Sequence, residues 1–184
     1  MSLEIQMGDT ILISGENGAG KSTLLKTLFQ GVERRELIWS SEYPGRQKVS
    51  YLGHEIGLYS SLSLYGNLKY FRGVSSHPIS SERESELIHG FSLKKKLQDP
   101  IYTLSEGMKR KSGILRALIP NPLILLLDEP LNGLDSKSSD VLFGILEEQK
   151  RNSALLIVSH ELEKFKRICN RHLLISSTGC NEIK

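Results

Sequence analysis

Short apolar runs and amphipathic segments alternate along most of the chain. Every position from residue 123 to residue 127 is apolar, which is typical of a central parallel strand covered on both faces. Five further segments have the composition of strands, namely residues 10–14, 36–40, 48–52, 154–158 and 172–176. Strands that alternate with helices predict an α/β fold in which a mainly parallel central sheet is flanked by helices.

Apolar residues recur at helical spacing between these strands. We expect helices over residues 22–29, 62–71, 81–89, 106–119, 136–151 and 161–169. Gly31 stands where the first helix should end, and Ser81 followed by Glu84 resembles a capping box for the third. Asp135 or Ser136 can cap the fifth.

The length and composition are those of an ordinary globular domain. The 184 residues suffice for one domain with a real core, or for a domain with a subdomain. We interpret residues 1–184 as a single domain. Within it, the three helices between about residues 56 and 118 form an inserted helical subdomain.

Charge and apolar content argue against several classes of protein. The formal net charge of +3 is too small to favour nucleic acid as a partner, and short basic clusters such as residues 109–111 are usually solvated helix faces. No apolar stretch approaches the ~18 residues of a membrane span, so we expect any membrane role to come through a partner. Cys169 and Cys180 form no disulfide framework or metal pattern, which fits a reducing cytoplasm.

The first candidate for chemistry is a glycine-rich loop between the first expected strand and helix. It fits the phosphate-binding pattern G-x-x-x-x-G-K-[ST] and consists of Gly15, Glu16, Asn17, Gly18, Ala19, Gly20, Lys21, Ser22 and Thr23. Glycines let successive backbone N–H groups approach an anion at the start of a helix. Lys21 would reach the β- and γ-phosphates, and the Ser22 hydroxyl would bind Mg²⁺.

A carboxylate pair, Asp128 and Glu129, follows the most apolar strand. Ligands gather at the carboxyl ends of parallel strands, so the pair should lie beside the phosphate loop if the two strands are neighbours. Asp128 would then hold Mg²⁺, and Glu129 could act on the attacking water as general base, a role worth ~10²–10⁴-fold in rate. The plainer alternative is two acids that open a loop.

Taken together, these motifs make the chain resemble the ATP-binding-cassette (ABC) ATPases over nearly all of its length. Residues 15–23 match the Walker A motif, and residues 104–108 (Leu-Ser-Glu-Gly-Met) resemble the signature usually written LSGGQ. Residues 123–129 match Walker B, residues 131–135 are similar to the D-loop, and residues 159–160 to the switch-histidine motif.

The resemblance implies a mechanism. Family members work as head-to-tail pairs, so Ser105 and Gly107 would contact the γ-phosphate of ATP held by a second cassette, while His160 would contact it within one subunit. It also implies ATP and Mg²⁺ as cofactors and an integral-membrane permease as partner. The cassette would be paired with a copy of itself or with another ABC ATPase, in the cytoplasm on the inner face of the membrane.

Three departures from the family pattern bear on these roles. His54 stands where the Q-loop glutamine contacts Mg²⁺ and water; an imidazole can bind a metal or water, so we carry both a catalytic and a metal role to His54. Glu106 and Met108 replace usual signature residues, and Glu106 puts a negative charge near a phosphate. The adenine-stacking aromatic lies upstream of Walker A in the family, and residues 1–14 contain no aromatic residue, so we expect a weaker hold on the nucleotide.

The sequence around His54 narrows the resemblance. Residues 53–54, 57–59 and 62–68 are similar to the ATPase subunit of cytochrome c-biogenesis haem exporters, and residues 104–108 with 131–135 to the wider group of exporter ATPases. Three alternatives stay open: a non-transport ABC ATPase, a degenerate nucleotide-binding subunit, and another phosphate-loop class such as a GTPase. The sequence contains no Asn-Lys-x-Asp, the guanine-binding motif that a GTPase would carry.

Overall fold

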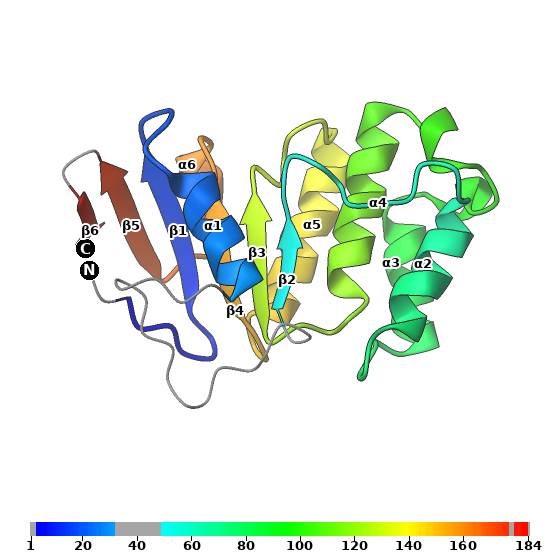
Figure 1. Cartoon of the computed structure of the whole chain (residues 1–184), viewed down its shortest axis with the longest axis horizontal. Coiled ribbons are helices and arrows are strands. Elements are labelled where there is room, and N and C mark those ends of the chain that lie inside the picture. The colour runs from blue at the N-terminus through cyan, green and yellow to red at the C-terminus, as the bar shows by residue number, and fades with distance from the viewer. Residues whose placement is uncertain (1–2, 32–48, 177–178, 184) are drawn as a thin grey trace.

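The computed structural model describes residues 3–31, 49–176 and 179–183. Within these ranges six strands form one sheet in the order β2-β3-β4-β1-β5-β6 (Figure 1). Neighbouring strands are parallel except for the last pair, β5 and β6, which is antiparallel. The strands are β1 (Thr10–Gly15), β2 (Val49–Leu52), β3 (Ile124–Asp128), β4 (Ala154–Val158), β5 (Arg171–Ser176) and β6 (Gly179–Ile183). The predicted α/β fold with a mainly parallel sheet is confirmed.

Helices cover both faces of this sheet, with α1 on one face and α5 and α6 on the other (Figure 1). Alternate strand positions therefore enter two separate cores: Leu126 packs with Leu25 of α1, whereas Leu125 packs with Leu146 of α5. The helices are α1 (Lys21–Gln30), α2 (Leu64–Gly73), α3 (Ser81–Gly90), α4 (Glu106–Leu118), α5 (Ser136–Gln149) and α6 (Leu162–Phe165), with short 3₁₀ helices at Lys94–Lys96 and Ile101–Thr103.

The helices α2, α3 and α4 gather beyond β2, at the opposite end of the molecule from β6 (Figure 1). We call residues 53–118 the helical region. Its apolar side chains, among them Leu68, Leu87 and Ile114, are buried and belong to the same core as the α5 side of the sheet. The helical region thus shares a hydrophobic core with the sheet and is not joined to it by the chain connections alone. No helix within the described ranges is both long and apolar enough to cross a membrane.

Several expected boundaries differ from the observed ones. The cap of α3 is Ser80, whose Oγ accepts from Arg83 N at 3.1 Å; the expected capping box with Ser81 is wrong because Glu84 is bound to Arg72. The last helix is only one turn long because Asn170 bonds to Thr10 of β1 and draws the chain into the sheet. The expected strand at residues 36–40 lies outside the described residues.

Candidate functional site

The phosphate loop is shaped by three glycines with positive φ. Gly15 ends β1 at φ 146° beside Ile175 of β5, where a Cβ would lie 2.0 Å from the Ile175 carbonyl oxygen. Gly18 and Gly20, at φ 83° and 97°, have open space where a side chain would be. No side chain caps the start of α1 at Gly20, so the first N–H groups of the helix remain for an anion.

Lys21 is buried beneath this loop. Its Nζ donates to the Gly15 carbonyl at 2.7 Å and to the Glu16 carbonyl at 2.8 Å. An ammonium has three donors, so one remains for a phosphate oxygen. The two carbonyl bonds fix the cation against the loop, the position that phosphate binding requires.

Asp128 lies at the carboxyl end of β3 and is buried. Its Oδ2 accepts a hydrogen bond from the Tyr51 hydroxyl at 3.3 Å. Burial, and then the neighbouring Asp128 charge, raise the pKa of Tyr51 to about 12, so the phenol stays a donor at neutral pH. The condition that β1 and β3 be neighbours is not met, because β4 lies between them in register.

Glu129 adopts an unusual backbone conformation for a non-glycine residue, with φ 48°. Its N–H donates to the Val158 carbonyl of β4 at 2.9 Å. Oε2 accepts from His160 N at 3.4 Å, while Oε1 is buried without a hydrogen-bond partner and lies 3.4 Å from His160 Nε2. A carboxylate with an unused buried oxygen at the end of a strand is suited to accept a proton.

Four of the predicted site residues line one cleft of about 700 Å³, whereas Lys21, His160, Ser105 and Gly107 are not among its lining residues. The cleft brings Ser22 of α1, Asp128 and Glu129 of the β3 end, and His54 of the helical region together. The remaining lining residues are Glu55, Ile56, Gly57, Leu58, Glu106, Lys109, Arg110, Asn132 and Gly133. The strand between β1 and β3 therefore does not separate the phosphate loop from the carboxylates.

Ser105 and Gly107 lie at the start of α4. Ser105 is exposed, and its Oγ caps the helix by accepting from Met108 N at 3.3 Å. A Cβ on Gly107 would lie 2.8 Å from the Gly133 carbonyl oxygen, so only glycine fits beneath residues 131–135. Glu106 is 87% exposed and bonds to Lys109 at 2.8 Å, which partly offsets its charge.

Two residues of this neighbourhood escaped the sequence reasoning, Tyr51 and Arg110. Arg110 is buried, and its guanidinium donates to the carbonyls of Gly53, Asp128 and Glu129 at 2.7, 2.7 and 2.6 Å. The cluster at residues 109–111 was expected to be a solvated face, and Arg110 shows that this interpretation is wrong for its central residue. No local sequence pattern distinguishes Arg110 from a solvated residue of the same cluster.

The donor set fits Mg²⁺ with a nucleotide. Mg²⁺ in phosphate-transfer sites is usually held by one or two protein oxygens together with substrate phosphates. Ser22 and Asp128, on one cleft, supply a hydroxyl and a carboxylate, and the described residues hold no cluster of three His, Cys, Asp or Glu side chains. The cleft therefore suits a metal that arrives with a phosphate and shares its ligands with it.

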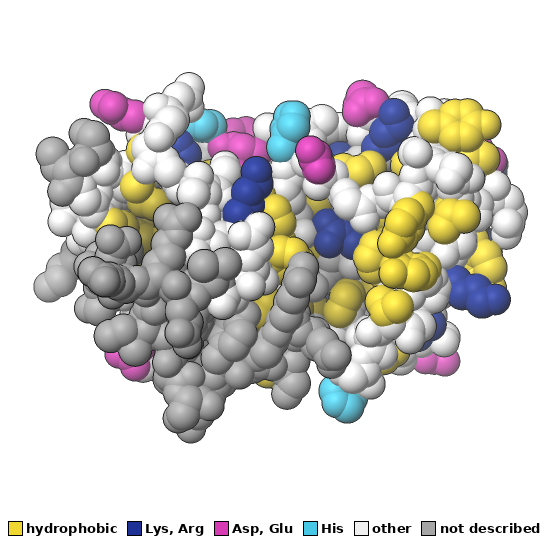
Figure 2. Space-filling view, in the orientation of Figure 1, with side chains coloured by type: hydrophobic (Ala, Val, Ile, Leu, Met, Phe, Trp, Pro, Cys, Tyr) yellow, Lys and Arg dark blue, Asp and Glu magenta, His cyan; other side chains and the backbone are white. Residues whose placement is uncertain are grey.

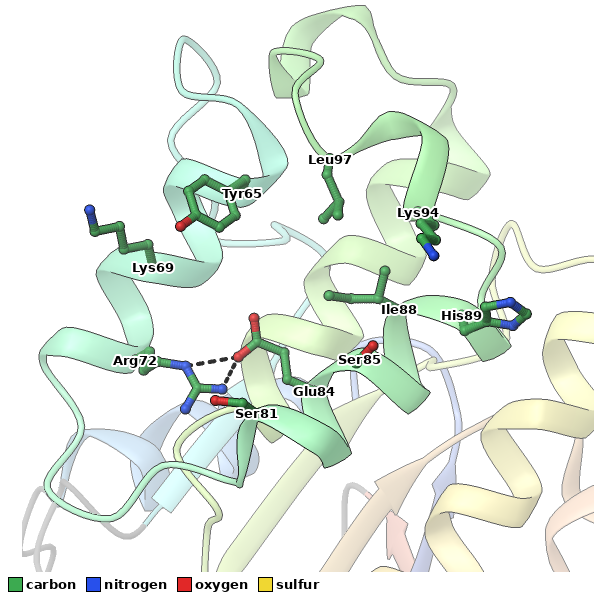
Figure 3. Close-up of a pocket in the computed structure, with 10 residues that line it drawn as sticks. All are labelled: Tyr65, Lys69, Arg72, Ser81, Glu84, Ser85, Ile88, His89, Lys94 and Leu97. Atoms are coloured by element: carbon green, nitrogen blue, oxygen red, sulfur yellow. Dashed lines mark hydrogen bonds and ion pairs between the residues drawn. The ribbon is translucent and has the colours of Figure 1, made fainter.

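A second hollow, of about 390 Å³, lies among α2, α3 and the 3₁₀ helix at Lys94–Lys96 (Figure 3). Arg72 is bound there to Glu84, while Lys69 and His89 extend away from its centre. Its charged groups do not converge on one point, so the cleft described above is the better candidate for chemistry.

Comparison with known proteins identifies the family. The family model described as ABC transporter matches residues 1–132. The ABC transporter ATP-binding protein NatA of Bacillus subtilis is 34% identical over 190 residues, spanning 96% of this chain and 77% of NatA. A solved ATP-binding subunit of an ABC transporter is 27% identical with a TM-score of 0.84, covering 94% of this chain and 77% of that one.

A further likeness concerns the fold alone. The ATP-binding cassette MJ0796, solved as a dimer in a post-hydrolysis state bound to ADP and Pi, is 22% identical with a TM-score of 0.82, covering 99% of this chain and 88% of that one. The match to the family model and the identity to NatA show that the chain belongs to the ATP-binding domains of ABC transporters. It is an ATPase of this family, and its cofactors are ATP and Mg²⁺.

Proposed function

We propose that this chain is the ATP-hydrolysing subunit of a transporter, that it pairs with a second cassette on binding ATP, and that it drives a separate membrane permease. One observation carries the hydrolytic part. Glu129 keeps a buried oxygen without a hydrogen-bond partner, in the cleft that Ser22 and Asp128 line. A carboxylate oxygen that accepts no hydrogen bond, beside the two proposed metal ligands, is suited to activate water.

The residues that line the cleft and their neighbours then divide the work. The loop from Gly15 to Thr23 and Lys21 hold the phosphates, and Ser22 with Asp128 hold Mg²⁺, which supplies charge neutralisation when bound. Glu129 takes the proton of the attacking water. His160, whose Nε2 lies 3.4 Å from Glu129 Oε1, contacts both the γ-phosphate and this carboxylate. His54, across the cleft, serves as the Q-loop residue.

Replacement of the proposed base gives the direct test. Glu129→Gln keeps the shape and one oxygen acceptor but cannot take a proton, so we expect steady-state ATPase to fall by about 10²-fold or more. Binding of ATP, measured by calorimetry, should stay within about threefold, because Lys21 and the loop are untouched. Turnover close to that of the wild type would remove Glu129 as base, and absence of turnover in the wild type, alone and with its membrane partner, would favour the degenerate subunit.

The position of the signature residues supports pairing with a second cassette. Ser105 is exposed at the start of α4, and its helix offers free N–H groups in a place where an anion can reach them. The fold likeness to MJ0796, solved as a dimer, supports a second cassette that contributes the ATP for Ser105 and Gly107 to contact. We propose a homodimer or a heterodimer with another ABC ATPase.

A permease partner is supported by the surface of the helical region. Large apolar side chains stand exposed there, and Figure 2 shows hydrophobic groups gathered on the side where α2 lies. They include Tyr59, Leu62, Tyr65, Tyr70 and Tyr102, each 42–66% exposed. Exposed patches of this kind mark interaction sites. We place the chain in the cytoplasm, peripheral on the inner face of the membrane, with residues 56–118 as the subdomain that meets the permease.

Purification from solubilised membranes tests this partner. A permease recovered with the chain would support the proposal, whereas nucleic acid or ribosomes would favour a non-transport ABC machine. The narrower proposal, export of haem in cytochrome c biogenesis, rests on the residues around His54. The names of the relatives above mention neither haem nor cytochrome c. Genes for cytochrome c assembly beside this one would support it, and their absence would weaken it.

A further inference from the structure

Arg110 is a buried arginine whose partners are main-chain carbonyls. It lies one turn inside α4 and is 7% exposed. Its Nη1 donates to the Gly53 carbonyl at 2.7 Å, and its Nη2 to the carbonyls of Asp128 at 2.7 Å and Glu129 at 2.6 Å. One guanidinium thereby joins three elements: α4, the segment after β2, and the end of β3.

Each of those carbonyls belongs to a functional position. Gly53 precedes His54, and Asp128 and Glu129 carry two of the carboxylates that line the cleft. Glu129 sits at φ 48°, a conformation that a non-glycine residue holds only when its surroundings impose it. The bond from Arg110 to the Glu129 carbonyl, together with the bond from the Glu129 N–H to Val158, supplies that constraint from both sides.

Burial of this cation is costly, and two observations indicate what offsets it. Hydrogen bonds from a charged donor, such as those from the Arg110 guanidinium, are stronger than bonds between neutral groups. Burial lowers the pKa of Arg110, and the negative charges of Asp128 and Glu129 oppose this shift. Among the described residues, three buried side-chain atoms lack a hydrogen-bond partner, and two of them, Arg110 Nε and Glu129 Oε1, lie here. A site that tolerates unpaired buried polar atoms is more often functional than structural.

We propose that Arg110 is a positioning residue which ties the placement of α4 to the geometry of Glu129. The helix that presents Ser105 at its N-terminus is the same helix that holds the base of the subunit's own cleft. A shift of α4 when Ser105 meets a second cassette therefore reaches Glu129 through one side chain. The role of Glu129 as base rests on the proposed function above.

The test is a set of substitutions in the full chain with ATP as the probe. Arg110→Gln keeps a donor but cannot span all three carbonyls, so we expect kcat to fall by about ten- to a hundredfold, the scale of a small misplacement of a catalytic group. ATP affinity by calorimetry should change less than about threefold, since no phosphate-loop bond is lost. Arg110→Lys, which keeps the charge and loses the fork, should restore kcat in part.

A double substitution separates positioning from folding. If Arg110 acts through Glu129, adding Arg110→Gln to Glu129→Gln should leave the residual turnover unchanged within about threefold. Equal fold losses in both backgrounds would overturn the proposal. Hydrogen exchange gives a readout without turnover: the Glu129 and Asn132 amides, bonded to the Val158 and Glu129 carbonyls, should exchange faster in Arg110→Gln. Unchanged exchange would also overturn it.

Arg116 provides the matched control on the same helix. Its guanidinium donates to the carbonyls of Ile56 at 3.2 Å and Tyr51 at 2.8 Å, and it makes no described bond to Asp128 or Glu129. Arg116→Gln should lower the melting temperature while changing kcat less than about threefold. An equal loss of kcat in both variants would show that any loosening of α4 suffices. If the wild type lacks turnover, the proposed function fails. The exchange measurement alone then tests whether Arg110 positions the backbone at Glu129.

Discussion

Among the glycines of the described residues, Gly15 leaves the least room for a side chain. Its φ of 146° is a region that side chains rarely adopt, and a Cβ would lie 2.0 Å from the Ile175 carbonyl oxygen. Because the clash is with backbone of a paired strand, neither partner can move without disrupting the β1–β5 ladder. The glycine therefore serves the fold as well as the phosphate loop that it begins.

Substitution of Gly15 tests this constraint. Gly15→Ala should lower the free energy of unfolding by about 3 kcal/mol or more, since overpacking adds to the strain at positive φ. Gly144→Ala is the control: Gly144 is exposed within α5 with open space around it, so alanine should stabilise by ~0.5–1 kcal/mol. Urea unfolding of both variants measures the difference, and a Gly15→Ala protein as stable as the wild type would contradict the geometry.

Asp135 should make stability depend on pH at the acid end. Its Oδ2 accepts from Lys111 at 2.9 Å and its Oδ1 from Ser138 N at 2.8 Å, and these bonds, the one from Lys111 first, hold the pKa of Asp135 well below its usual value. A carboxylate whose folded pKa is depressed adds stability above its unfolded pKa of about 3.9. That stability is lost as the pH falls through the folded value.

We therefore expect Asp135→Ala to destabilise the protein at pH 7 by ~0.5–2 kcal/mol, the usual cost of losing a helix cap. The gap between variant and wild type should narrow as the pH falls below about 4, because the unfolded wild-type chain then binds a proton at Asp135 that the folded protein does not. Asp135→Asn keeps a cap that does not titrate and separates the two effects. Urea unfolding between pH 3 and pH 7 makes the comparison; a gap that widens in acid would refute this account.

Single residues of the cleft were predictable only where a motif fixes both type and spacing. Lys21, Ser22 and Asp128 follow from the glycine loop and the apolar strand, and the structure brings Ser22 and Asp128 to one cleft. Arg110 was not predictable, because a basic residue on a helix has the same local pattern whether it faces water or carbonyls 18 residues away. Tyr51 of β2 was not predictable either, because its hydrogen bond to Asp128 joins positions 77 residues apart. Burial of that kind depends on which elements pack together.

At the scale of elements, α4 combines a structural and a functional demand at one residue. Ser105 caps the helix, and we propose that it also faces a phosphate held by a second cassette. Ser80 caps α3 in the same way but is not part of the signature at residues 104–108, so it isolates the first demand from the second.

Three cap variants separate these demands. Ser105→Ala and Ser80→Ala should each lose about 1 kcal/mol of stability, but only Ser105→Ala should also lower ATPase activity. Ser105→Asp keeps a good cap and so should keep stability, yet it places a carboxylate against a phosphate, and turnover should fall about tenfold or more. Thermal melting and steady-state ATPase of the three proteins measure both effects. Full activity in Ser105→Asp would leave Ser105 as a cap alone.

Elements with strong periodicity were predicted well, and elements held by distant partners were not. The central strands and α4 begin and end within a residue or two of expectation because apolar runs and caps are local signals. The strand β6 was missed: its sequence lacks apolar alternation, and it is held through pairing with β5 and an ion pair between Glu182 and Arg171. The strand order, with β4 between β1 and β3, likewise depends on long-range packing.

At the scale of the whole molecule, Ser105 is exposed while Lys21 is buried beneath the phosphate loop. This suggests that one ATP site is built from residues of two subunits. If each complete site combines the phosphate loop of one subunit with the signature of another, two different inactive variants can repair one another. A dimer of Lys21→Ala with Ser105→Arg would hold one site with both defects and one site with neither. If every site lay within one chain, all sites in the mixture would be defective.

We expect Lys21→Ala and Ser105→Arg each to lose ATPase activity alone, because one lacks the phosphate-binding cation and the other blocks the signature. An equal mixture should recover up to about a quarter of wild-type activity, since half of the dimers are mixed and each has one intact site. The recovery should grow with protein concentration, as pairing obeys mass action. Mixing Lys21→Ala with Glu129→Gln is the control: both defects then affect the cleft side, so every site in the mixed dimer is damaged and no activity should return. A mixture of the first pair that stays inactive at all concentrations would contradict shared sites.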